Sequence, residues 1–106
     1  MLGAALLSVV ASPALAGGAD AYKVRGEICA AFGPRCSEAI EVARCETGNT
    51  WDVYARNGEH WGLFQVSAHW RRTIRGFAWN ARAQARHAYR VFRLTGSTWR
   101  HWTCKP

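Results

Sequence analysis

The sequence predicts a small α+β domain, mostly helical, with a short β-hairpin and disulfide bonds. Three observations lead to this prediction: segments with apolar residues at helical spacing, one stretch rich in residues that favour strands, and four cysteines. The chain has 106 residues, of which 49% are hydrophobic and 20% are charged. This balance is typical of a globular chain rather than a disordered one, and the length suits a single domain.

The first sixteen residues carry no charge and end in the small-x-small pattern Ala-Leu-Ala before Gly17. Such a segment is typical of the apolar core and cleavage site of an export signal. A buried N-terminal helix is the alternative, but Pro13 and the lack of a polar face disfavour it. We therefore expect a signal peptide at 1–16 and a mature domain at 17–106. The protein would be secreted, and extracellular or associated with the cell wall.

A mature domain of this size buries only a modest core, so it often needs a covalent crosslink. An even number of cysteines in an oxidising compartment predicts two disulfides. The four are Cys29, Cys36, Cys45 and Cys104. Zinc is the competing use, but no Cys-x-x-Cys pair is present and the four histidines lie far apart, so we expect no metal. Spacing alone leaves three disulfide connectivities open.

Two helices are predicted in the first half of the mature domain. An amphipathic segment covers 21–31, and the sequence Phe-Gly-Pro-Arg at 32–35 interrupts it. Ser37 is the expected N-cap of a second helix, which the Gly-Asn pair at 48–49 terminates. Residues at helical spacing on this helix are Ala39, Ile40, Ala43 and Glu46. Glu46 is therefore expected on or beside the buried face.

The following stretch, 50–66, favours strands because it is rich in Thr, Val and aromatic residues. Asn57-Gly58 is a turn signal, so a short, irregular hairpin is expected here. Residues 68–76 are expected to form a short helix ending at Gly76.

The clearest helix follows, from Ala81 to Leu94, with Asn80 as its N-cap and Gly96 closing it. One face is apolar and carries Ala81, Ala85, Ala88 and Phe92. Another face carries Arg82, Arg86, Arg90 and Arg93. We expect the arginine face to be solvated. With a net charge of +7, it would favour encounter with anionic wall polymers.

Glu46 is the acidic residue whose position is unusual. It lies at the inner side of a helix end, beside Cys45 and before an aromatic-rich loop. The negative end of the helix dipole and partial burial both raise the pKa of a carboxyl, which suits a general acid near neutral pH. The alternative is a helix-end glutamate bonded to a nearby backbone amide.

Several short motifs occur together and in order. They are Val42-Ala43-Arg44-Cys45-Glu46-Thr47-Gly48, Gly62-Leu63-Phe64-Gln65, Trp79-Asn80-Ala81 and the tail Trp99-Arg100-His101-Trp102. As a set they resemble the catalytic segment of the lytic transglycosylases and related lysozyme-like muralytic enzymes. The cysteine before the glutamate and the C-terminal Trp-x-Cys are also similar to the resuscitation-promoting factors of actinobacteria. The resemblance covers nearly all of the mature domain.

The resemblance implies a lysozyme-like fold with a cleft for peptidoglycan glycan strands, and Glu46 as the catalytic acid. It also implies that Cys45 pairs with Cys104, which leaves the other two cysteines to pair. Gly62 and Gln65 would line the cleft, and the Gln65 amide could bind acetamido groups or hold the hairpin by a structural bond. The family usually has serine where this chain has Thr47, whose hydroxyl could still bond the glutamate or the substrate.

Aromatic residues could stack on sugar faces, although in so small a domain such residues are often core. The candidates are Trp61, Trp70 and Tyr89. Asp52 and Glu59 are the candidates for a second carboxylate, but both are expected in solvent.

A missing second carboxylate favours a lytic transglycosylase over a hydrolase, because hydrolysis generally uses two. Glu46 would protonate the oxygen between N-acetylmuramic acid and N-acetylglucosamine, and then take the proton of the muramyl C6 hydroxyl as a 1,6-anhydro ring closes. The alternatives are a hydrolytic muramidase, a non-catalytic peptidoglycan-binding protein, and a cationic protein that acts on membranes or nucleic acid. We expect a monomer without cofactor, nucleic-acid partner or, in the mature form, membrane span.

Overall fold

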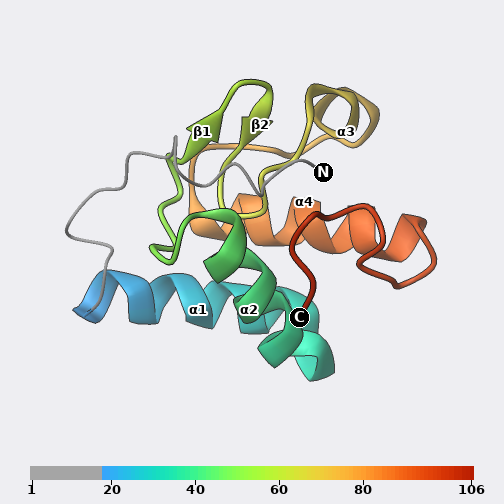
Figure 1. Ribbon diagram of the computed structural model, residues 1–106. Coiled ribbons are helices and arrows are strands. Elements are labelled where there is room, and N and C mark those ends of the chain that lie inside the picture. Colours follow the sequence, from blue (N-terminus) through green and yellow to red (C-terminus); the bar gives the residue numbers. More distant parts are fainter. Residues whose placement is uncertain (1–17) are drawn as a thin grey trace.

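The computed structural model describes residues 18–106, so the predicted signal peptide lies outside the described residues. Figure 1 shows the order of the elements along the chain. They are α1 (Gly18–Phe32), the 3-10 turn η3 (Gly33–Arg35), α2 (Cys36–Glu46), β1 (Arg56–Asn57), β2 (His60–Trp61), α3 (Ala68–Thr73) and α4 (Ala81–Leu94). The predicted α+β class, mostly helical with one small hairpin, is confirmed.

The junction between α1 and α2 differs from the expected one. α1 is longer than the predicted 21–31, and η3 occupies the predicted break and leads directly into α2. Ser37 is therefore not the N-cap: it lies in the first turn of α2, and the cap residue Arg35 makes no side-chain cap bond. A serine cap is unnecessary because the Cys36 N–H already bonds to the Gly33 carbonyl of the 3-10 turn.

The hairpin is short and irregular, as predicted. Arg56 pairs with Trp61 and Asn57 pairs with His60, so residues 58–59 form the turn. An isolated bridge between Trp61 and Val66 folds the chain back once more. α3 ends earlier than the predicted 68–76 because the backbone is already extended at Ile74.

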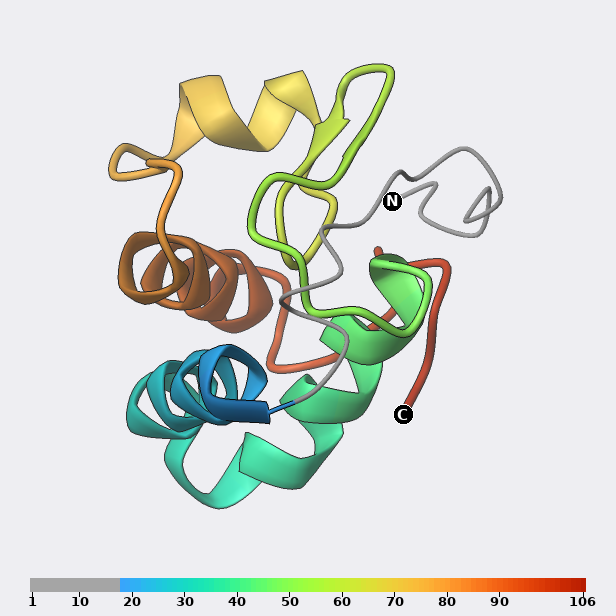
Figure 2. The same ribbon diagram turned by 90° about the vertical axis from the view of Figure 1, so that its left-hand side faces the viewer.

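α4 has the predicted bounds, and the Asn80 side chain accepts a hydrogen bond from the Ala83 N–H at 2.9 Å, which confirms its role as N-cap. α1 and α4 lie side by side and are seen end-on in Figure 2. The core is enclosed by α1, α4, α2 and the loops around the hairpin. Phe32 is at its centre and stacks on Phe64 and Trp99, both with ring centroids 5.5 Å away.

The C-terminal tail returns to the end of α2 through the Cys45–Cys104 disulfide, and Cys29 pairs with Cys36. Both pairings agree with those that the sequence resemblance implies. Trp102 anchors the tail in the core and donates its indole N–H to the Phe64 carbonyl at 3.0 Å. None of the helices within 18–106 combines the length and apolar character needed to span a membrane.

Candidate active site at the end of helix α2

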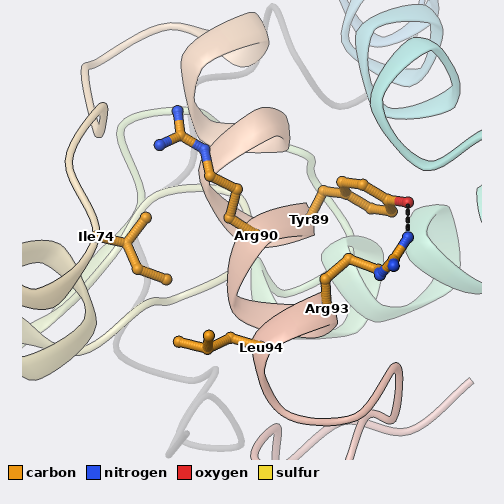
Figure 3. Close-up of a pocket in the computed structure, with 5 residues that line it drawn as sticks. All are labelled: Ile74, Tyr89, Arg90, Arg93 and Leu94. Carbon is orange, nitrogen blue, oxygen red and sulfur yellow. Dashed lines mark hydrogen bonds between the residues drawn. The ribbon is translucent and has the colours of Figure 1, made fainter.

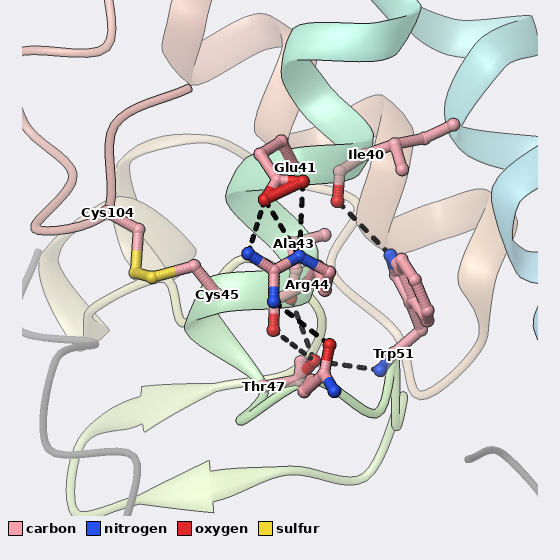
Figure 4. A network of polar contacts seen from close by, with 9 residues as sticks. Ile40, Glu41, Ala43, Arg44, Cys45, Thr47, Trp51 and Cys104 are labelled. Carbon is pink, nitrogen blue, oxygen red and sulfur yellow. Dashed lines mark hydrogen bonds and ion pairs between the residues drawn. A yellow bond between two sulfur atoms is a disulfide. The ribbon is translucent and has the colours of Figure 1, made fainter.

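The end of α2 is held by Thr47, which is fully buried. Its hydroxyl donates a hydrogen bond to the Ala43 carbonyl and accepts one from the Trp51 N–H, both at 2.8 Å (Figure 4). Gly48 and Asn49 then take positive φ angles of 66° and 72°, which end the helix. The Thr47 hydroxyl therefore fixes the loop that leaves α2, while its predicted contact with substrate stays a prediction.

Glu46 has no exposed surface, and its two carboxyl oxygens lie in different settings. Oε2 accepts a hydrogen bond from the Cys104 N–H at 3.2 Å, and Oε1 is buried with no hydrogen-bond partner. The disulfide from Cys104 to the neighbouring Cys45 holds that N–H in place. The carboxyl is thus fixed through one oxygen, and the other can carry a proton.

Burial raises the pKa of Glu46 from 4.5 to about 7, although the Cys104 N–H and the positive charge of Lys105 act in the opposite direction. The proton is favoured because a buried carboxylate loses its hydration and Glu46 has only one donor to replace it. At neutral pH this carboxyl can therefore both donate and accept a proton, as a general acid/base must.

Glu41, one turn earlier on the same helix, shows the contrast. It is partly exposed and forms a short ion pair with Arg44, whose hydrogen bonds lower the pKa of Glu41 (Figure 4). The Arg44 guanidinium also donates to the Asn49 side chain at 2.9 Å. Glu41 is therefore an ordinary ionised surface carboxylate, and of these two α2 residues only Glu46 is suited to proton transfer near pH 7.

Gln65 is also fully buried. Its amide nitrogen donates to the carbonyl oxygens of Ala55 at 3.2 Å and Gly62 at 3.0 Å, which is the structural alternative anticipated for this residue. The amide oxygen has no partner. The side chain thus stabilises the turn after the hairpin with its donors and keeps one acceptor free, and its predicted contact with acetamido groups would have to use that oxygen.

Gly62 is required by the backbone at this turn. Its φ is +79°, and a Cβ at this position would lie 2.6 Å from the amide oxygen of Gln84. Gln84 is a buried residue of α4 for which the sequence pattern predicts no role. Its amide accepts from the Leu63 N–H and donates to the carbonyls of Val53 and Ala78, all within 3.1 Å. The sequence signal for this buried role is that the glutamine lies between the alanines of the predicted buried face.

His87, on the same buried face of α4, was missed as well. Its Nε2 lies 2.9 Å from the Ile74 carbonyl and 3.2 Å from that of Trp70, so this nitrogen carries the hydrogen. Burial lowers the pKa of His87. A neutral, buried histidine here ties α3 and its following loop to α4.

The expectation that Asp52 lies in solvent is wrong, because only 2% of its surface is exposed. Its Oδ1 accepts a hydrogen bond from the Tyr54 N–H at 2.9 Å, an Asx turn that folds the loop back over the carboxylate. Glu59, at the tip of the hairpin, is exposed as expected. Within 18–106 there is no cluster of three or more His, Cys, Asp or Glu residues that could hold a metal.

The predicted sugar-stacking residues lie in different parts of the molecule. Trp61 is on the hairpin, with the guanidinium groups of Arg71 and Arg56 at 3.7 and 4.2 Å from its ring centroid. Tyr89 packs edge-on against Phe32, near the start of α2, at 5.2 Å. Stacking of either residue on a sugar stays a prediction.

Comparison of the chain with models of known protein families, with curated proteins and with solved structures finds no match.

Proposed function

We propose that this protein is a secreted peptidoglycan-cleaving enzyme that breaks the β-1,4 bond between N-acetylmuramic acid and N-acetylglucosamine, with Glu46 as its general acid/base. The observation that carries the proposal is the buried Glu46 carboxyl, whose pKa of about 7 lets it hold a proton at neutral pH. The sequence motifs around Glu46 and Gln65, which resemble those of lytic transglycosylases, supply the substrate class.

The proposed reaction needs only one carboxyl. Glu46 donates its proton to the glycosidic oxygen as the bond from that oxygen to muramyl C1 breaks. The muramyl C6 oxygen then bonds to C1 and closes a 1,6-anhydro ring, and its hydroxyl proton returns to Glu46. No water is consumed, and the acid is regenerated. The internal hydroxyl is already next to C1, which lowers the entropic barrier relative to attack by an outside nucleophile.

The other carboxyl groups near the hairpin support this route over hydrolysis. Asp52 is engaged by the backbone of its own Asx turn, and Glu59 is exposed at the hairpin tip. A two-carboxylate hydrolase would need one of them as the nucleophile or as the base that activates a water.

The test is digestion of purified peptidoglycan followed by mass spectrometry of the products. We expect muropeptides with 1,6-anhydro ends, each lighter by one water than the reducing product. Glu46→Gln, which keeps the side-chain size but removes the titrating group, is expected to reduce the rate at least about a hundredfold. Glu41→Gln, which removes a carboxylate from the same helix, is the matched control and is expected to keep its activity. Full activity of Glu46→Gln would contradict the proposal, and reducing muramyl ends would replace it with a hydrolase.

A further inference from the structure

A row of arginines on the exposed side of α4 borders a groove that the proposed catalysis does not use. Three adjoining hollows make up this groove, with volumes of about 390, 280 and 70 Å³. Neighbouring hollows adjoin because they share residues: Tyr89 and Arg90 line the first two, and Arg86 lines the second and third. Figure 3 shows the largest hollow, where Arg93 donates a hydrogen bond to the Tyr89 hydroxyl and Arg90 extends from α4 in another direction. We call it the α4 groove.

The charge of the α4 groove is strongly one-sided. Arg82, at one end, lies 3.8 Å from Glu27, which is the one acidic residue lining the groove. Along the rest of the groove, no carboxylate of the described chain forms an ion pair with Arg86, Arg90 or Arg93. These guanidinium groups repel one another, and only bound anions would neutralise them.

The arrangement favours an elongated ligand. Residues 86–93 extend about 10 Å along the helix axis, so their arginines can meet several charges of one linear polymer at once. Guanidinium groups bind phosphate oxygens in a two-pronged geometry. On the α1 side the groove is lined by Ala30 and Ala31, whose small side chains leave room for a chain to lie against the helix.

The groove is not suited to nucleobases or to a bilayer. Its one aromatic side chain, Tyr89, is partly buried and packs against Phe32 and Phe92, so its ring is not a free platform for a base. The apolar face of α4 is buried in the core, and Leu94 is the one large hydrophobic residue of the groove that is strongly exposed, at 65%. Insertion into lipid needs a wider apolar face.

We propose that the α4 groove binds a linear, base-free phosphodiester polymer, of the poly(glycerol phosphate) type, through Arg86, Arg90 and Arg93. This binding surface is separate from Glu46 and would retain the protein on an anionic wall polymer. It does not depend on the proposed catalysis, so Glu46→Gln is expected to bind the polymer like the unaltered protein.

The test measures binding of the oxidised protein to synthetic poly(glycerol phosphate) over a range of salt concentrations. The double variant Arg86→Gln/Arg90→Gln is expected to bind the polymer about tenfold more weakly. Its plot of log affinity against log salt is expected to be less steep by about 1.4, because two phosphate contacts are lost. The matched control Arg72→Gln/Arg100→Gln removes the same charge from exposed positions outside the groove, and its affinity is expected to change less than about twofold.

Two further ligands test the chemistry: single-stranded oligothymidine of equal charge and vesicles of phosphatidylglycerol. We expect both ligands to bind more weakly than the polymer. For each of these ligands, the groove variant and the control variant are expected to weaken binding to the same extent. The proposal is overturned if the polymer does not bind, if both double variants weaken polymer binding equally, or if either of the other ligands binds more tightly and depends on Arg86 and Arg90.

Discussion

Replacement of Glu46 by glutamine is expected to stabilise the fold at alkaline pH and to leave it nearly unchanged in acid. The pKa of Glu46 is about 7 in the folded protein against 4.5 for an ordinary glutamate, because burial disfavours its charged form. The protonated form is therefore the one that the fold favours. Its contribution to stability is complete below about pH 4.5 and is lost as the pH rises through 7.

The magnitude follows from the same two values. A gap of about 2.5 between them, at 1.36 kcal/mol for each pH unit, corresponds to about 3 kcal/mol lost above pH 7. Glutamine cannot ionise, and its amide oxygen can still accept the hydrogen bond from the Cys104 N–H. Glu46→Gln should therefore be more stable than the unaltered protein by up to about 3 kcal/mol at pH 8, and by less than about 1 kcal/mol at pH 4.

The assay is urea unfolding of both proteins, disulfides intact, at pH 4, 6 and 8. Glu41→Gln is the control with the opposite sign, because Arg44 lowers the pKa of Glu41. The stabilising contribution of Glu41 is present above about pH 4.5 and is lost as the pH falls below that value. If Glu46→Gln changed the free energy of unfolding equally at pH 4 and pH 8, the pKa of Glu46 would not be raised by folding, and the reasoning would fail.

Two further predictions concern the residues that shape the site. Removing the disulfide between Cys45 and Cys104, which are 59 residues apart, should lower the free energy of unfolding by about 4 kcal/mol. Removing the Cys29–Cys36 disulfide should lower it by about 2 kcal/mol, because that bond closes a loop of only seven residues. Equal losses for the two Cys→Ala double variants in urea unfolding would contradict the loop-length argument. Gly62→Ala should cost more than about 2 kcal/mol, because it adds a clash with Gln84 to the strain of a positive φ. Gly58→Ala, where φ is also positive but the space is open, should cost about 1 kcal/mol, and similar thermal unfolding of the two variants would show that the clash is relieved.

Local signals in the sequence were sufficient where one element determines its own structure. The bounds of α4 were predictable because Asn80, the alanine spacing and Gly96 agree with one another. Ser37 was misjudged because the 3-10 turn before α2 supplies the hydrogen bond that a cap would make. The burial of Asp52 depends on how its loop folds back, which no residue pattern encodes.

Buried polar side chains on α4 were missed for a related reason. Gln84 and His87 bond to carbonyl and N–H groups of distant loops, so their partners are known only once the chain is folded. The α4 groove likewise requires α1 to lie beside α4, whereas the arginine spacing alone indicates only a solvated face. The position of Glu46 on the inner side of α2 was predictable from helical spacing, but its bond to the Cys104 N–H depends on the return of the tail.

The most direct test of a neutral-pH proton donor at the end of α2 is an NMR titration of the side-chain carboxyl carbons, with the Glu46 signal assigned by its loss in Glu46→Gln. A midpoint near 7 for Glu46, well above those of Glu38 and Glu41, is the result that we predict. A midpoint near 4.5 would mean that Glu46 is already ionised at neutral pH, and the assignment of this residue as the catalytic acid would be wrong.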